Sequence, residues 1–240
     1  MSLYADSRYP VGDAYAALHG DELDSFARPG TWGTAAERTA IAAVARRART
    51  EAGVQESVDD ESLADGAELP AAARELAHRV ALGGATIDRE YFEQVRAAGL
   101  GEGAYVEIVG IVARLAHLDV FARGIGVPSR PLAAPTETHA PSRERPREAR
   151  DEGFFVPSIP AAPAGGAVAE SLYGKGPAAN ILRSLSLVAD EARRLNRVVD
   201  TEYFSMATIF DLTHSSLEAL SRPQIELVAA RVSALNRCFY

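Results

Sequence analysis

The chain has 240 residues, of which 47% are apolar and 24% charged, so it can form a globular core as one large domain or two of ordinary size. A net charge of −8 at pH 7 would be repelled by a phosphate backbone, and no stretch approaches the ~20 apolar residues of a membrane span, so we expect neither a nucleic acid nor a membrane as partner. The single cysteine cannot form an internal disulfide, which is typical of a protein of the reducing cytoplasm.

The first half of the chain predicts four helices. Its apolar residues are mainly alanine, with few aromatic residues and few β-branched runs, and this favours helix over sheet. Thr34 and Glu37 have the spacing of a capping box, and Gly53 is a stop signal. The last of the four helices is apolar nearly all round, which indicates a buried helix. The predicted helices cover residues 34–52, 70–82, a segment from Thr86 or Asp88 to before Gly99, and 104–123.

Residues 127–170 differ in composition and predict a linker without regular structure. Eight of the thirteen prolines lie in this segment, together with a run of mixed charge over residues 143–152 that is typical of solvated chain. Phe154, Phe155 and Val156 are apolar, and they indicate that the linker packs against the body of the protein.

Helical patterns resume after the linker. Short helices are predicted over residues 181–187, 190–199 and 204–212, with a turn over 215–220. Ser221 and Gln224 form a second capping box at the start of the last helix, and Asn236 is placed to end it. Residues 34–43 and 221–230 both begin with a capping box of the same spacing and continue with a similar pattern of small residues. This similarity indicates a faint internal repeat.

Cys238 is a candidate for chemistry because of the sequence around it. A lone cysteine is usually a small buried apolar residue. Here, residues 221–240 read SRPQIELVAARVSALNRCFY, and this sequence resembles the active-site region of the carboxymuconolactone decarboxylase/AhpD-like superfamily. In that family a glutamate lies twelve residues before the first cysteine of a Cys-x-x-Cys pair, and Glu226 stands at that distance from Cys238.

The resemblance implies roles for these residues. Glu226 would relay protons and Cys238 would be the resolving thiol of a peroxide-reducing pair. A chain break at Asn236 would place Cys238 at a helix N-terminus, where its thiolate is favoured. Tyr240 would line the pocket, and His214, although it suits a plain loop role, could approach Cys238.

The family's second cysteine and its histidine have no counterpart in residues 1–240. One hypothesis is that the next codon is UGA for selenocysteine, read as stop, which would give a Cys-x-x-Sec centre; the alternative is a truncation. In both cases we expect negligible hydroperoxide turnover from these 240 residues and restored turnover when the missing residue and histidine are added.

The resemblance also implies an all-α fold of two AhpD-like lobes. Residues 91–128 resemble the helices that usually follow the cysteine pair. We therefore expect a degenerate lobe over residues 1–126, the linker over 127–170, and an incomplete active-site lobe over 171–240.

The expected function is thus an alkylhydroperoxidase-like thiol or selenol peroxidase. Its partners would be a small hydroperoxide and a thiol reductant, with no metal, no organic cofactor and a homo-oligomeric assembly. Two alternatives stay open. One is a cofactor-free decarboxylase of lactone acids, which the superfamily includes, and the other is a non-catalytic protein that oligomerises through exposed apolar helix faces.

Overall fold

The computed structural model describes residues 2–205, 208–209, 211–236 and 238. In these residues the regular structure is helical and no strand occurs, apart from one isolated antiparallel bridge between Arg150 and Ser158. This confirms the all-α prediction, whereas the AhpD-like arrangement of two lobes stays a prediction. The chain forms two compact units, Met1–Asn196 and Arg197–Tyr240, and the division falls within one helix.

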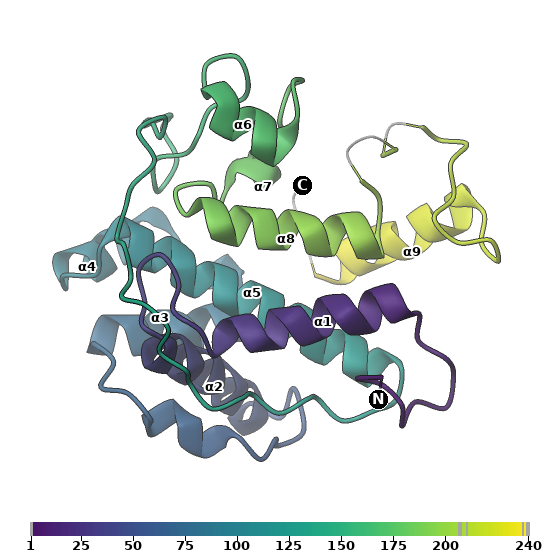
Figure 1. The fold of residues 1–240 in the computed structure, drawn as a ribbon, viewed down its shortest axis with the longest axis horizontal. Coiled ribbons are helices and arrows are strands. Elements are labelled where there is room, and N and C mark those ends of the chain that lie inside the picture. Colours follow the sequence, from purple (N-terminus) through teal and green to yellow (C-terminus); the bar gives the residue numbers. More distant parts are fainter. Residues whose placement is uncertain (1, 206–207, 210, 237, 239–240) are drawn as a thin grey trace. The chain divides into compact units, whose positions relative to one another are not determined.

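The first unit contains the long helices of the protein (Figure 1). Helix α2 packs against α1, α3 and α5, and α5 also packs against α1 and α3. The elements are α1 (Asp13–Phe26), α2 (Ala35–Glu51), η1 (Glu61–Asp65), α3 (Ala71–Leu82), η2 (Gly84–Thr86), α4 (Arg89–Ala97), α5 (Glu102–Gly124), α6 (Gly166–Tyr173), α7 (Asn180–Arg183) and α8 (Ala189–Glu202), the last of which continues into the second unit.

The core of the first unit surrounds α5, as its pattern predicts. Ile111 and Leu115 are fully buried, and burying each such side chain stabilises the fold by roughly 1.5–3 kcal/mol. Helix α2 contributes mainly alanines, whose small side chains let neighbouring helices approach closely. Its start is the predicted capping box: Thr34 Oγ1 accepts from the Glu37 N–H at 3.2 Å, and the Glu37 carboxylate accepts from the Thr34 N–H at 2.8 Å.

The segment between α5 and α6 packs on this core. Val156 and Ile159 are buried in it, and the Phe155 ring stacks on Phe92 with 5.5 Å between ring centroids. The elements that follow belong to the same core, because Leu172 of α6 and Ala192 of α8 are buried in it. The first unit therefore extends to Asn196, beyond the predicted boundaries at residues 126 and 170.

Two helices were not predicted. Helix α1 contains Gly20, which has low helix propensity, and α6 begins at Gly166 inside the predicted linker. The helix predicted over residues 181–187 is shorter than expected. Ser184 Oγ and Ser186 Oγ donate to carbonyl oxygens three residues back, a local bond that competes with helix propagation.

The second unit contains helix α9 (Arg222–Leu235) and the chain that leads to it. The helix predicted over residues 204–212 is not formed by the described residues, which make turns. The carbonyl oxygens of Ile209 and Asp211 accept instead from the Arg222 guanidinium, at 2.7 and 3.0 Å. Carbonyls used in this way are not available for a helical ladder.

Candidate functional site

Helix α9 holds Glu226, the predicted relay acid, one turn after its cap. The helix begins as predicted, since Gln224 Oε1 accepts from the Ser221 N–H at 2.8 Å. The Glu226 carboxylate accepts from the Tyr203 hydroxyl at 2.8 Å and from Arg222 Nε at 2.7 Å. Both hydrogen bonds, that of Tyr203 first, lower the pKa of Glu226. Glu226 is therefore an ionised acceptor at neutral pH and a weaker base than an ordinary glutamate.

Arg222 organises the surroundings of Glu226. It is 5% exposed, and its guanidinium carbon lies 3.8 Å from the centroid of the Phe204 ring. Together with its bonds to two backbone carbonyls, this stacking fixes the side chain that holds Glu226. The second unit thus has a small centre of its own around one buried arginine.

Cys238 is exposed and follows the end of α9. Its N–H donates to the Ser233 carbonyl oxygen at 2.9 Å and so closes the last turn of the helix. Asn236 caps the helix, as predicted, but with φ −80° rather than in the left-handed conformation. Because α9 is continuous from Glu226 to Leu235, the helix separates these two positions by about 13 Å along its axis. The helix itself does not bring the predicted acid to the thiol.

The other two predicted residues lie differently. His214 is half-buried, and its ring centroid is 6.1 Å from that of Phe204, the ring on which Arg222 stacks. The structure therefore places His214 and Glu226 around the same arginine–phenylalanine pair. The approach of His214 to Cys238 stays a prediction, and Tyr240 lies outside the described residues.

A second candidate site is a network of buried charges in the first unit, which we call the core ion network (Glu22, Arg38, Glu107, Arg114 and Glu191). Arg38 Nη1 lies 2.6 Å from Glu107 Oε1 and 3.0 Å from Glu191 Oε1. Arg114 Nη2 lies 2.6 Å from Glu191 Oε2, and Arg114 also pairs with Glu22. All five residues are almost completely buried.

The buried carboxylates of the network each face a guanidinium group. Arg194 Nη1 reaches Glu22 Oε1 at 3.1 Å and also the partly exposed Asp21 Oδ2 at 3.5 Å, so three guanidinium groups face three buried carboxylates and one nearer the surface. Although burial alone would raise the pKa of Glu191, the positive charges of Arg114 and Arg38 outweigh it and hold the pKa below its ordinary value. Paired charges of this kind carry a large penalty when one partner is removed, so we assign the network to the stability of the fold.

A second set of buried charges ties α2 to α5. Arg46 Nη2 lies 2.7 Å from Asp119 Oδ1, Arg49 pairs with the same carboxylate, and Arg46 also pairs with Asp60. Asp60 in turn accepts from the Leu132 N–H at 3.0 Å. These pairs join α2, α5, the residue just before η1 and the segment after α5 through one group of charges.

Sequence reasoning did not single out either set of charges. The signal was present in α5, where Glu107, Arg114 and Asp119 interrupt a helix that is otherwise apolar nearly all round. A charged residue on such a helix has no solvent-facing side and needs a buried partner. The partners lie on α1, α2 and α8, and a sequence pattern alone does not show which residues they are.

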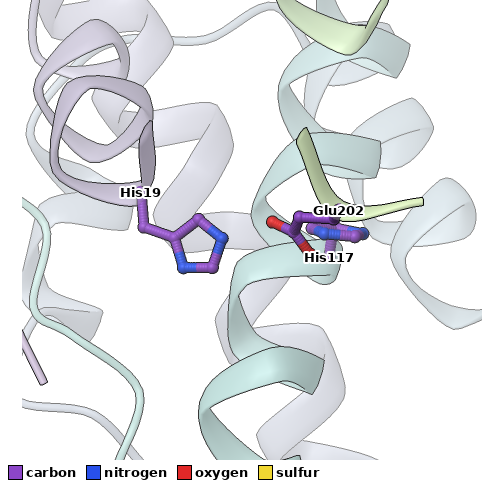
Figure 2. Close-up of side chains that lie close together, drawn as sticks. All are labelled: His19, His117 and Glu202. Atoms are coloured by element: carbon purple, nitrogen blue, oxygen red, sulfur yellow. The ribbon is translucent and has the colours of Figure 1, made fainter. Parts of the chain in front are cut away.

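Two histidines of the first unit also lie near each other. The ring centroids of His19 (α1) and His117 (α5) are 6.4 Å apart in an edge-on arrangement, and His19 Nδ1 shares a hydrogen bond of 2.7 Å with the Tyr4 hydroxyl (Figure 2). Glu202, also labelled there, belongs to the second unit. The His19 ring also packs edge-on against Phe121, with 4.6 Å between centroids. This contact is typical of a histidine that packs in the protein interior.

Comparisons of this chain with protein-family models, with curated proteins and with solved structures found no match. Among the helices of the described residues, none combines the length and the apolar character needed to cross a membrane.

Proposed function

We propose slow thiol-peroxidase chemistry in which Cys238, the resolving thiol of the resembled family, itself attacks the peroxide in these 240 residues, with Glu226 as a proton-relay residue. Because the second cysteine and the histidine have no counterpart here, we expect single oxidation events rather than efficient turnover. The observation that carries the proposal is the exposed position of Cys238 beyond the end of α9, together with a glutamate twelve positions earlier that is held as a carboxylate. These two residues match part of the pattern of the alkylhydroperoxidases that the sequence resembles, whose second cysteine and histidine have no counterpart in residues 1–240. Exposure suits a thiol that must meet a peroxide and then a reductant.

The reaction starts with the Cys238 thiolate and an organic hydroperoxide. The sulfur attacks the terminal peroxide oxygen, the O–O bond breaks, and the leaving alkoxide takes a proton to become an alcohol. The cysteine is then a sulfenic acid. A thiol reductant condenses with it to give a mixed disulfide and water, and a second thiol releases the Cys238 thiol and a reductant disulfide.

Glu226 would act in this cycle as an acceptor and relay rather than as a strong base. Its carboxylate is already bonded to Arg222 and Tyr203, and its lowered pKa makes it hard to protonate near neutral pH. General acid–base catalysis contributes about 10²–10⁴-fold, and a base with a lowered pKa falls at the lower end. Because such catalysis needs hydrogen-bond reach and α9 holds Glu226 about 13 Å along its axis from Leu235, the relay has to run through water. We therefore expect Glu226→Gln to slow oxidation of Cys238 by no more than about 100-fold.

Trapping of the sulfenic acid tests this proposal. The full chain is treated with cumene hydroperoxide in the presence of dimedone, and the adduct is mapped by mass spectrometry. We expect one adduct at Cys238 for each molecule of alcohol formed, and none in Cys238→Ser. An unmodified Cys238 after exposure to hydroperoxide would refute the proposal.

A second candidate function is self-association through α9, because this helix exposes an apolar face. Val228, Val232 and Leu235 recur at helical spacing and are 61%, 50% and 63% exposed. Glu226 lies on the other side of the helix by the same spacing, so a partner could cover the apolar face and leave the carboxylate open.

Sedimentation of the full chain tests this second candidate. We expect an oligomer, and a shift toward monomer when Val228 and Val232 are both changed to serine. Leu82→Ser is the matched control, because Leu82 is an exposed leucine at the end of α3. A monomeric wild-type chain would contradict self-association.

A further inference from the structure

A cavity of about 330 Å³ lies in the first unit, between α5, α7 and the segment that precedes α6. Its inner wall is apolar: Val106 of α5 and Leu185 after α7 are 2% and 6% exposed. Asn180 and Ser184 also line the cavity and are exposed, so one end reaches the surface. The cavity is thus a pocket with a buried apolar end and a polar rim.

The walls of this pocket are held in place by several contacts. The Phe155 ring stacks on Phe92, which in turn packs edge-on against Tyr105 with 5.1 Å between centroids. Arg89 of α4 donates to the carbonyl oxygens of Gly153 and Phe154, at 3.3 and 3.4 Å. A wall fixed in this way does not have to be ordered when a ligand binds, which favours affinity.

The charged groups next to the pocket are already paired. Arg183 forms an ion pair with Glu152, and its Nη2 donates to Ser158 Oγ at 3.1 Å. Its Nε donates to the Ile159 carbonyl oxygen at 3.3 Å. Because one positive and one negative charge cancel at this wall, the pocket favours an uncharged ligand over an anion.

Tyr105 supplies a hydrogen-bond donor inside the pocket. Its side chain lines the cavity, and within the described part of the chain its hydroxyl has no hydrogen-bond partner. Burial raises the pKa of Tyr105 to about 12, so the hydroxyl keeps its proton at neutral pH. A tyrosine hydroxyl that keeps its proton is a hydrogen-bond donor for a ligand acceptor.

We propose that this pocket binds an uncharged, mainly apolar molecule with one carbonyl oxygen, which accepts a hydrogen bond from Tyr105. An apolar cavity of about 150 Å³ takes one benzene ring, so a pocket of this volume takes roughly twice as much. An aromatic ketone of the size of 2-acetonaphthone fits this description. The pocket belongs to the first unit, and the proposal does not depend on the chemistry proposed for Cys238 and Glu226 of the second unit.

Binding of three probes of similar size tests the proposal by titration calorimetry on the full chain. The probes are 2-acetonaphthone, its hydrocarbon analogue 2-ethylnaphthalene and the anion 2-naphthoate. We expect saturable binding of the ketone and weaker binding of the other two. Tyr105→Phe should weaken the ketone about 2- to 10-fold, the worth of one neutral hydrogen bond, and leave the hydrocarbon unchanged.

Val109→Phe provides a second variant, because Val109 lines the pocket and a larger side chain there fills it. We expect it to abolish binding of both the ketone and the hydrocarbon while the far-UV circular dichroism stays that of the wild type. Absent saturable binding, tighter binding of naphthoate, or an unchanged ketone affinity in Tyr105→Phe would each overturn the proposal. If Val109→Phe does not fold, the Tyr105→Phe comparison decides alone.

Discussion

Helices α2 and α9 start alike and are used differently. Each begins with a hydroxyl residue and, three positions later, a Glu or Gln that bonds back to its N–H. Most of α2 is then buried, including Arg38 and Arg46, whereas among the described residues of α9 Arg222 is buried. The same local signal therefore introduces a central helix in one unit and a mostly exposed helix in the other.

The difference shows that the cap sets where a helix begins and that its long-range partners decide its role. In α2 the buried arginines meet carboxylates on α5 and α8 and that of Asp60, the residue just before η1. In α9 the buried arginine meets carbonyls from the preceding turns and a glutamate one turn ahead. Arginine is suited to both settings because its five N–H donors fix several acceptors at once.

Arg114→Met tests how much the buried charges of the first unit stabilise it, and we expect it to cause the largest loss of unfolding free energy. It leaves Glu22 and Glu191 without their shared partner in the interior, and breaking a buried pair costs about 3–5 kcal/mol. Urea unfolding followed by fluorescence of Trp32, the single tryptophan, measures the loss. Arg193→Met is the control, because its pair with Asp190 is exposed and is worth at most about 1 kcal/mol. Equal losses in the two variants would contradict the account.

Gly110→Ala tests how closely the network is packed. A Cβ at Gly110 would lie 3.1 Å from the Glu191 Cβ and closer still to its carboxylate, so we expect a loss of about 1–3 kcal/mol in the same unfolding assay. Gly124→Ala is the matched control on α5, because a Cβ there meets nothing within 4 Å. A Gly110→Ala variant as stable as Gly124→Ala would show that the network has room to move.

The two caps allow a direct comparison. Thr34→Ala and Ser221→Ala each remove an N-cap side chain, at a typical cost of about 1 kcal/mol. We expect Thr34→Ala to lower the unfolding free energy reported by Trp32, and Ser221→Ala to speed hydrogen exchange in residues 222–235 without changing the Trp32 transition. A change of the Trp32 transition in Ser221→Ala would contradict independent caps.

Acid has the smallest expected effect, and it acts through Glu226. Its folded-state pKa is below that of the unfolded chain, so its contribution to stability is present above about pH 4.3 and is lost as the pH falls through the folded-state value. Hydrogen exchange in residues 222–235 should therefore accelerate below about pH 4 in the wild type. Glu226→Gln should lack this dependence, and an identical pH profile in both chains would contradict it.

Sequence alone predicted the features that depend on near neighbours. The caps at Thr34 and Ser221, the burial of α5 and the helix end at Asn236 follow from residues within a few positions. The third cap was expected at Thr86 or Asp88, and the structure has it at Asp88. Features that depend on distant partners were not predicted. Examples are the core ion network, which joins four helices, and the place of residues 171–196 in the first core.

For the candidate site, too, the sequence predicted the positions of residues along the chain but not their contacts. Sequence placed Glu226 on the last helix and Cys238 beyond its end, as the structure has them. It did not predict that Tyr203 and Arg222 hold the Glu226 carboxylate. Tyr203 lies on another segment, whereas Arg222 stands four residues before Glu226, a helical ion-pair spacing that the sequence offered but that was not used. These two bonds and the lowered pKa make Glu226 a carboxylate acceptor within the predicted relay.

The rate at which Cys238 reacts with hydroperoxide tests the central claim most directly. The same full chain is compared when folded and when unfolded in urea, with the loss of thiol followed at one pH. Since a thiol activated by its surroundings loses that advantage on unfolding, we predict that the folded chain reacts at least about 10-fold faster. Equal rates in the two states would show that the fold does not activate Cys238 and would contradict the proposed function.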